Sequence, residues 1–444
     1  MESSIHFPKP YLAEGTIHIP ASAYAEAYRH RIRELRRELT LPGFRPGQVP
    51  SDVIMGRYGE EVLSQLLADR FMKALKELLG DKQLFQYPLH QRTPETYQVK
   101  PPLADYVYTF RALVVAQEAL IQKPVSLVRY AYQEAPDDLS IFQRYIQIIL
   151  GRLEKLEVLP EFFPADRFVL LHLLWKPKEG GIPLQLRWNS FIEPFPWRYL
   201  AGHKVGDTFE VPPQVLSSYI EYIRVYYPEY SPITAEETKL TLTAAASAIP
   251  LSLEASEEKL HFHENPDFAP QEQWQKLLHH HVHKALRDLN GRLLKNRLLH
   301  AADITIPSDI AQYLYILYLA SRSQANGERL DYTEFQQELA WELLFQNLVA
   351  TEPALQVSQA ELQETIWENI QKVGDISEES QKFLSLLRES EAARDKFIAS
   401  LLERNESSLR RGLQLQRLET FLKEKFGEPT EHLLPLKLIL LYTL

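Results

Sequence analysis

"LPGFRPGQVP", residues 41–50, places three prolines and two glycines around a single phenylalanine and a single arginine. Each proline fixes φ and removes a backbone donor, and the glycines permit backbone angles that are closed to other residues. A helix cannot continue through this composition, and a central strand would not accept three prolines. The stretch therefore predicts a constrained loop, with Leu41 and Val49 holding its base and Phe44 and Arg45 near its apex.

An arginine-rich segment precedes this loop. Residues 21–40 predict a helix, because apolar side chains recur at spacings of four, three and four residues. These side chains are Tyr28, Ile32, Leu35 and Leu39. A second stripe beside them is basic and contains Arg29, Arg33, Arg36 and Arg37. Six arginines against three glutamates between residues 24 and 47 reverse the balance of a chain with 59 acidic and 49 basic residues.

A second predicted helix follows the loop. Ser51 and Asp52 can cap its N-terminus, and apolar residues recur every four positions from Ile54 onward. Residues 11–20 alternate between apolar and polar side chains and predict a strand. Residues 96–115 predict a strand, a turn and a further strand. The N-terminal region is therefore expected to form a compact α+β unit.

Beyond this unit the pattern becomes β and then helical. Residues 125–133 predict a strand, residues 136–156 predict a helix, and residues 166–250 are mostly β, with glycine and proline between apolar runs. Six helices are predicted after that, at 270–298, 307–322, 332–349, 358–371, 379–403 and 407–426. Two capping boxes support them, Thr333 with Gln336 and Ser358 with Glu361.

Composition limits the class of protein. Apolar residues make up 45% and charged residues 24% of the 444 residues, which is ordinary for globular proteins with sizeable cores. The absence of cysteine excludes disulfides and thiolate metal sites. We see no signal-peptide pattern and no apolar run near the ~20 residues of a membrane helix. With a net charge of −10, any contact with a polyanion has to be local.

The segment around the loop resembles the ribosome-docking signature of trigger factor, a bacterial ribosome-associated chaperone family. That family carries G-F-R-x-G-K-x-P between a basic helix and a second helix with R-Y-G. This chain matches at Gly43, Phe44, Arg45, Gly47 and Pro50, and then at Arg57, Tyr58 and Gly59. Gln48 stands where the family usually has lysine. The resemblance implies a ribosome-binding site made of Gly43, Phe44, Arg45, Gly47, Gln48, Arg36 and Arg37.

The resemblance extends along the chain, because residues 297–310 and 335–366 are similar to stretches of the family's two C-terminal arms. It implies an α+β multidomain fold with four parts. These are an α+β ribosome-binding domain at 1–115, a linker strand and helix at 116–163 that joins the C-terminal body, a mostly-β FKBP-like domain at 164–250, and an all-α client-binding body with arms at 251–444.

The middle region departs from the family pattern. Residues 165–171 and 201–211 resemble the opening and closing stretches of an FKBP-type prolyl isomerase. The first strand lacks the family's acidic residue, and no Ile-Pro-Gly element precedes Trp197. Because isomerisation needs an apolar, shaped pocket that holds the imide twisted, we expect little isomerase activity and no catalytic residue. Trp188, Phe195 and Trp197 form either an aromatic client patch or part of the β core.

The predicted helix at 307–322 carries more apolar side chains than one buried face requires. Tyr313, Tyr315, Ile316, Tyr318 and Leu319 encircle it. Two interpretations stay open. The surplus suits a concave surface for apolar client segments, or the same side chains are buried between adjacent helices.

A histidine-rich run, LLHHHVHKAL, lies at residues 277–286. His279 and His283 stand at i, i+4, which is the spacing of a helical metal pair. His280 occupies the position that a zincin gives to glutamate, and no third ligand is evident. We therefore expect a solvated helix face, and we predict no metal and no cofactor.

These observations predict an ATP-independent cytoplasmic chaperone with the ribosome (exit-region protein and rRNA) and unfolded nascent chains as partners. We expect no membrane partner, and the family resemblance suggests a homodimer when the protein is free. Three alternatives stay open: an active prolyl isomerase with chaperone activity, a ribosome-independent holdase, and a general RNA-binding protein that uses the arginine stripe.

Overall fold

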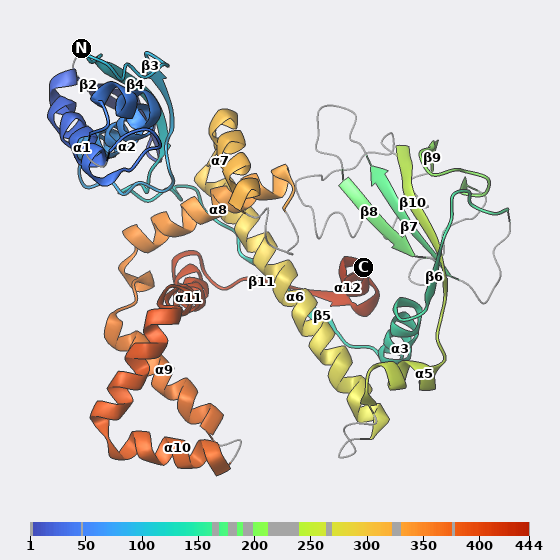
Figure 1. The fold of residues 1–444 in the computed structure, drawn as a ribbon. Helices are drawn as coiled ribbons and strands as arrows, with labels where there is room; N and C mark the ends of the chain where they lie inside the picture. The colour runs from blue at the N-terminus through green and yellow to red at the C-terminus, as the bar shows by residue number, and fades with distance from the viewer. Residues whose placement is uncertain are drawn as a thin grey trace. The chain divides into compact units, whose positions relative to one another are not determined.

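The computed structural model describes residues 3–45, 48–161, 168–175, 184–189, 199–211, 239–262, 269–321, 330–374 and 378–443. The chain divides into two compact units (Figure 1). The first contains Met1–Val125 and Arg297–Gly427, and the second contains Ser126–Asn296 and Glu428–Leu444. Each unit thus combines segments that are far apart in the sequence. No helix in the described part of the chain is long and apolar enough to cross a membrane.

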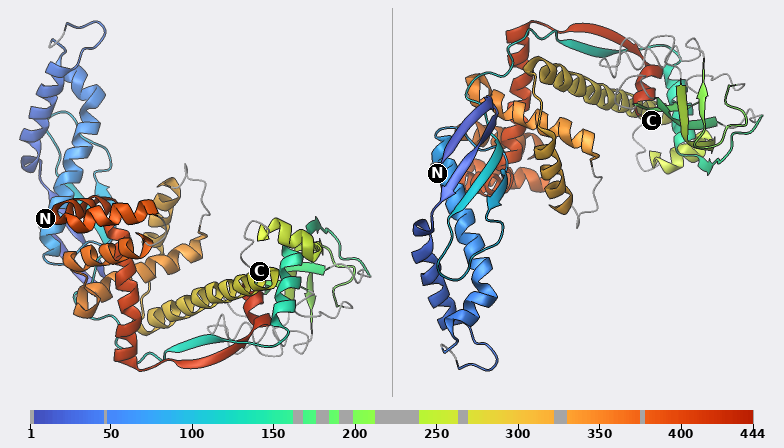
Figure 2. Two further views of the ribbon diagram at one scale, coloured as in Figure 1. Left: turned by 90° about the horizontal axis from the view of Figure 1, so that it is seen from below. Right: turned by 90° about the horizontal axis from the view of Figure 1, so that it is seen from above.

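The N-terminal part of the first unit is a four-stranded antiparallel sheet with two helices. Its strand order is β1 (Ser4–Lys9), β2 (Leu12–Ile19), β4 (Tyr106–Leu113) and β3 (Leu89–Thr93). The helices are α1 (Ala25–Glu38) and α2 (Ser51–Leu79). Alternate side chains of β2 and β4, such as Ile17 and Phe110, are buried in the same core as Phe71 of α2. Figure 2 shows α1 and α2 side by side, with their connecting loop at the end of the pair away from the sheet.

The prediction of two strands within 96–115 is half wrong. β4 is present, but its hairpin partner β3 ends at Thr93, and residues 94–105 form an irregular strap. Three prolines in this strap remove backbone donors that a strand would need. Tyrosines hold it in place instead: Tyr24 donates to the Ala104 carbonyl at 2.6 Å, and Tyr28 donates to the Val99 carbonyl at 2.9 Å.

The helical part of the first unit follows the predicted pattern with different ends. It comprises α7 (Ser308–Ser321), α8 (Tyr332–Thr351), a 3₁₀ turn (Pro353–Leu355), α9 (Gln359–Gly374), α10 (Glu378–Glu389) and α11 (Glu391–Phe426). The predicted break near residue 405 is wrong, because α11 runs through it and begins instead after the capping Ser390.

The predicted caps met different outcomes. The capping box of Ser358 and Glu361 is confirmed. The box predicted from Thr333 and Gln336 is wrong, because Asp331 is the cap and exchanges hydrogen bonds with Glu334. Ser51 does not cap α2, since it is already the first helical residue and Pro50 precedes it without a side-chain bond. The starts of these three helices were thus located to within two residues, but competing Ser, Thr and Asp caps were not distinguished.

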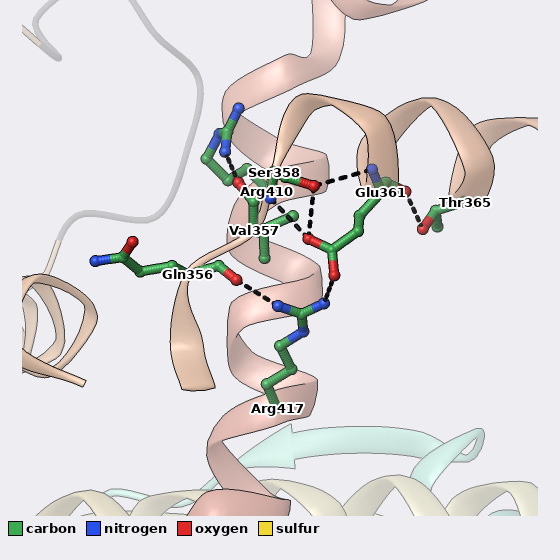
Figure 3. A network of polar contacts seen from close by, with 7 residues as sticks. All are labelled: Gln356, Val357, Ser358, Glu361, Thr365, Arg410 and Arg417. Atoms are coloured by element: carbon green, nitrogen blue, oxygen red, sulfur yellow. Dashed lines mark hydrogen bonds and ion pairs between the residues drawn. The ribbon is translucent and has the colours of Figure 1, made fainter. Parts of the chain in front are cut away.

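A polar network fastens the start of α9 to α11 (Figure 3). Arg417 donates to the Gln356 carbonyl and to the Glu361 carboxylate, and Arg410 donates to the Val357 carbonyl. Glu361 also accepts from the Ser358 backbone at 2.7 Å. This backbone bond, and next the Arg417 guanidinium, lower the pKa of Glu361 to about 2. With Glu361 ionised at neutral pH, the network holds the start of α9 against α11.

The second unit contains a five-stranded antiparallel sheet. Its order is β6 (Arg152–Lys155), β10 (Lys239–Ile249), β7 (Phe168–Trp175) and β8 (Leu184–Asn189), and β9 (Thr208–Glu210) also pairs with β10. Helices α3 (Asp138–Ile149) and α5 (Leu253–Lys259) also belong to this unit. Its core joins the sheet to one side of α6 (Pro270–Ala302), where Trp274 is buried.

Two predictions fail in the second unit. The helix expected over 136–156 ends at Ile149, and β6 follows. Gly151 allows this change, because a Cβ there would lie 2.2 Å from the Ile249 carbonyl oxygen. The all-α assignment of 251–444 is also wrong, since β11 (Thr430–Pro435) pairs in parallel with β5 (Val128–Gln133). The apolar end of the chain is helix α12 (Leu436–Thr443).

Candidate functional site

The loop between α1 and α2 begins with a tight turn. The Phe44 amide donates to the Leu41 carbonyl at 3.1 Å, which closes a four-residue turn. Pro42 and Gly43 fill the central positions that a type II turn gives to proline and to a glycine with positive φ, and φ of Gly43 is +88°. A further bond, 2.9 Å long, runs from the Gln48 amide to the Arg45 carbonyl. The backbone on both sides of Arg45 is therefore constrained.

The base of the loop is buried and its tip is open. Leu41 and Val49 are buried at 8% and 0% exposure and belong to the domain core. Phe44 is 38% exposed, and Arg45 and Gln48 are also exposed. An aromatic side chain on a stiff turn can enter a partner's pocket with little loss of conformational entropy. Gly47, the remaining loop residue of the predicted site, lies outside the described residues.

Most arginines beside the loop lack an acidic partner. Arg31 is the exception on α1, because it pairs with Glu34 and Glu38. In the described part of the chain, five other arginines have no carboxylate oxygen within 4.0 Å: Arg29, Arg33, Arg36, Arg37 and Arg45. The half-buried Arg36 has a buried Nε atom without a hydrogen-bond partner. This set of unpaired charges favours an anionic partner such as carboxylate or phosphate.

Close packing behind the loop fixes the two helices against each other. Gly59 of α2 faces Tyr28 of α1, and a Cβ on Gly59 would lie 2.7 Å from the Tyr28 hydroxyl oxygen. The same Cβ would lie 3.1 Å from the Cβ of Val99 in the strap. The glycine of the R-Y-G motif therefore lets α1, α2 and the strap meet. The neighbouring Arg57 is exposed on the outside of α2.

The predicted client residues divide into two groups. Tyr315 of α7 is partly buried against α8. Its ring lies 5.4 Å from the ring of Tyr332, and its hydroxyl donates to the Leu330 carbonyl. Ile316 is 64% exposed, and the adjacent Leu317 is exposed as well. Tyr313 is half-buried; burial raises its pKa, and the nearby Tyr87 phenol raises it further. The helix therefore buries some of these side chains between neighbouring helices and leaves others exposed.

The aromatic patch predicted in the β region is not assembled by the described residues. Trp188 lies in β8 opposite Leu171 of β7, and Phe195 and Trp197 fall outside the described residues. The segment before residue 199, where the sequence lacks the Ile-Pro-Gly element of an isomerase, lies outside them too.

The histidines do not form a recognisable metal centre in the described part of the chain. No group of three or more His, Cys, Asp or Glu side chains there could hold an ion. His279, His280 and His283 are exposed, whereas His281 packs on the rings of Phe142 and Tyr145. Burial lowers the pKa of His281.

Several contributors were missed by sequence reasoning. Leu317 and Tyr87 extend the apolar surface of α7, but their exposure depends on how α7 and the N-terminal domain pack. Asn347 organises the segment after the N-terminal domain, and a lone asparagine within an apolar helix pattern was the available signal.

The fold and loop define a multidomain protein of mixed helix and strand with a rigid, cationic aromatic tip. Residues 1–120 match the family model described as bacterial trigger factor protein (TF). The resemblance to trigger factor predicted from the sequence is thereby confirmed, and curated relatives agree with it.

Three relatives illustrate the extent of the similarity. The chain is 24% identical over 245 residues to trigger factor of Acidiphilium cryptum, covering 52% of this chain and 51% of the relative. It is 23% identical over 299 residues to that of Gluconacetobacter diazotrophicus, covering 64% and 63%. Identity to that of Rhodospirillum rubrum is 37% over 71 residues, 16% of each chain. The matches thus span about half to just under two thirds of the first two relatives.

A solved structure is also similar over most of the chain. It is titled "Promiscuous Substrate Recognition in Folding and Assembly Activities of the Trigger Factor Chaperone". The match covers 94% of this chain and 100% of that one, with 17% identity and a TM-score of 0.31.

Proposed function

We propose that this chain is an ATP-independent chaperone of the bacterial cytoplasm that docks at the ribosomal exit region and shields nascent polypeptides. The observation that carries the proposal is the exposed pair Phe44 and Arg45 on a turn whose base is buried. The aromatic ring supplies an apolar anchor. The unpaired arginines of α1, among them Arg36 and Arg37, supply cations for ribosomal phosphate or carboxylate groups.

The remaining assignments belong to the same proposal. Residues 1–115 act as the docking domain, 164–250 as an FKBP-like domain that contributes no catalytic residue, and 251–444 as the client-binding body joined by 116–163. The client surface is the exposed part of α7, with Tyr313, Ile316 and Leu317. Weak contacts there would hold apolar segments and release them without ATP.

Gln48 distinguishes this loop from the family pattern. An amide replaces a lysine, so one charge-assisted contact to an anionic partner is lost. We propose that docking is retained but weaker, since Phe44, Arg45 and the α1 arginines are all present.

Site-specific photo-crosslinking tests the docking proposal. A benzoylphenylalanine placed at position 44 is expected to label a ribosomal component when the full chain is mixed with bacterial ribosomes. The matched control places the same group at position 7, because Phe7 is also 38% exposed in the same domain. Equal labelling from both positions, or none from position 44, would overturn the docking proposal.

A further inference from the structure

Between residues 279 and 287, the face of α6 opposite its buried stripe carries only histidine and basic side chains. The buried stripe of this helix contains Trp274, Leu278, Val282, Ala285 and Leu289. At 3.6 residues per turn, His280, His283 and Arg287 lie on the opposite side, with His279 and Lys284 flanking them. All five of these side chains are exposed. We call them the α6 cationic face.

Within the α6 cationic face, histidines stand four residues from another histidine or from a basic residue. His279 precedes His283, His280 precedes Lys284, and His283 precedes Arg287 at this spacing. These pairs carry like charges only when the histidines are protonated, and like charges at i, i+4 destabilise a helix. In its protonated form such a face costs stability unless an anion offsets it.

Acidic groups do not neutralise this face. Asp288 lies 3.9 Å from the Nε atom of Arg287. Among the described residues, none of the other four side chains of the face has a carboxylate oxygen within 4.0 Å.

Two further titratable residues of α6 are exposed next to the face. Lys276 stands three and four residues before His279 and His280, and Asp288 stands four residues after Lys284. The other titratable residues of α6 are Glu272, His281, Arg292, Lys295, Arg297 and His300. From the packed helices, α3 contributes Tyr145 against His281, and α5 contributes Glu257, which accepts from Trp274. Lys276 and Asp288 have opposite charges, so together they leave the charge of the face to its own five side chains.

We propose that the α6 cationic face binds the phosphate backbone of RNA, and that binding tightens as the pH falls below neutrality. Histidine is the side chain that changes charge between about pH 5 and 8, so acidification adds cations to the two that Lys284 and Arg287 already supply. The face lies in the second unit and the docking loop in the first, so this site is additional to the proposed ribosome docking and does not depend on it.

The chemistry of the face selects a phosphate polymer over a polypeptide. From residue 279 to residue 288 its exposed positions include no apolar or aromatic residue. Protein partners are usually anchored by buried aromatic and aliphatic side chains, which this face cannot receive. Binding to nucleic-acid backbones needs only cations, because released counterions supply the free energy. The cations are spaced about one helical turn apart, roughly 5.4 Å, which presents them as a row.

Fluorescence anisotropy of a short labelled oligouridylate tests the proposal. All proteins carry Phe44→Ala/Arg45→Ala to remove the loop's contribution, and each is titrated at about pH 6 and about pH 8 over a range of salt concentrations. The test variant is His279→Gln/His280→Gln/His283→Gln. The matched control is His6→Gln/His300→Gln/His432→Gln, which removes three exposed histidines from other surfaces.

We expect the oligouridylate to bind roughly tenfold more tightly at the lower pH. The slope of log binding constant against log salt concentration should become steeper by up to about 2, because each of three added cations contributes ~0.7. The test variant should lose both effects, and the control variant should keep them. Lys284→Gln/Arg287→Gln should weaken binding at both pH values. An unchanged pH dependence in the test variant would overturn the proposal. So would displacement of the RNA by a polyglutamate peptide at equal or lower concentration, which would identify an acidic polypeptide as the ligand.

Discussion

The side-chain amide of Asn347 on α8 donates to the backbone carbonyl of Ala116 at 2.9 Å. The same amide nitrogen donates to the Glu118 carbonyl at 3.0 Å, and its Oδ1 atom accepts from the Leu120 amide at 3.3 Å. Asn347 is fully buried. One side chain therefore satisfies three backbone groups of the segment that leaves the N-terminal domain, and joins that segment to the helical part of the first unit.

Removing this amide should destabilise the first unit. Asn347→Ala leaves buried carbonyls and an N–H without partners, which costs about 1–3 kcal/mol in the free energy of unfolding. Urea unfolding measures the loss. The control is Asn405→Ala on the exposed side of α11, which should change stability by less than about 0.5 kcal/mol. Equal effects of the two substitutions would show that the Asn347 contacts contribute nothing specific.

Gly59 and Gly56 offer a matched pair on α2. Gly59→Ala forces a Cβ to within 2.7 Å of the Tyr28 hydroxyl oxygen, so overpacking should cost about 1–3 kcal/mol. A Cβ at Gly56 meets no atom within 4 Å. Gly56→Ala should therefore stabilise by up to about 1 kcal/mol, because alanine is the better helix former. Thermal unfolding of both variants checks the opposite signs, and a stable Gly59→Ala protein would refute the packing argument.

His90 should make the N-terminal domain sensitive to acid. Its ring stacks on Phe71 at 4.8 Å and on Tyr108 at 5.5 Å. Burial, and next the Arg92 guanidinium, lower the pKa of His90 below its usual 6.5. Between the folded and unfolded pKa values the unfolded chain binds more protons, so stability is complete above about pH 6.5 and falls as the pH drops below it.

The variant His90→Phe should flatten this acid dependence, because it removes the titrating group while it keeps an aromatic ring. Urea unfolding at a series of pH values measures it. The exposed His30→Gln variant serves as the control and should follow the parent protein. A parent-like pH dependence in His90→Phe would assign the acid sensitivity to other groups, such as His281, whose pKa burial also lowers.

Gln48→Lys should strengthen ribosome docking. The side chain at position 48 is exposed beside Arg45, and a charge-assisted hydrogen bond exceeds a neutral one by roughly 1 kcal/mol. About fivefold tighter binding is therefore expected at low salt, and the gain should shrink as salt rises. Titration of labelled protein with ribosomes measures both. An equal gain from an added lysine at the exposed Gln91 would show that net charge alone is responsible.

The parts of the fold that could be predicted are those determined by residues close together in the sequence. Prolines and a positive-φ glycine fix the turn from Leu41 to Phe44 without help from the rest of the chain, and Leu41 and Val49 are apolar at its base. Helical periodicity located α1 and α2 in the same way. The strap at 94–105 could not be predicted, because it is held by two tyrosines distant in sequence, Tyr28 of α1 and Tyr24 just before that helix.

Non-local pairing explains most of the failures. β11 pairs with β5 far earlier in the chain, Thr430 opposite Val128, and nothing in either segment identifies its partner. The exposure of Ile316 beside the partly buried Tyr315 depends on which side of α7 faces α8, and several rotations would satisfy its all-round apolar pattern. The sequence motif identified the proposed docking residues. Their exposure could be known only from the structure, because it depends on how α1 and α2 pack.

Co-sedimentation with bacterial ribosomes tests the central claim most directly. The full chain should pellet with ribosomes at low salt, and Phe44→Ala/Arg45→Ala should abolish the effect. Phe7→Ala/Lys73→Ala, which removes an equally exposed phenylalanine and an exposed cation elsewhere in the same domain, should pellet like the parent. Failure of the parent to pellet, or equal pelleting of all three proteins, would contradict docking through the 41–50 loop.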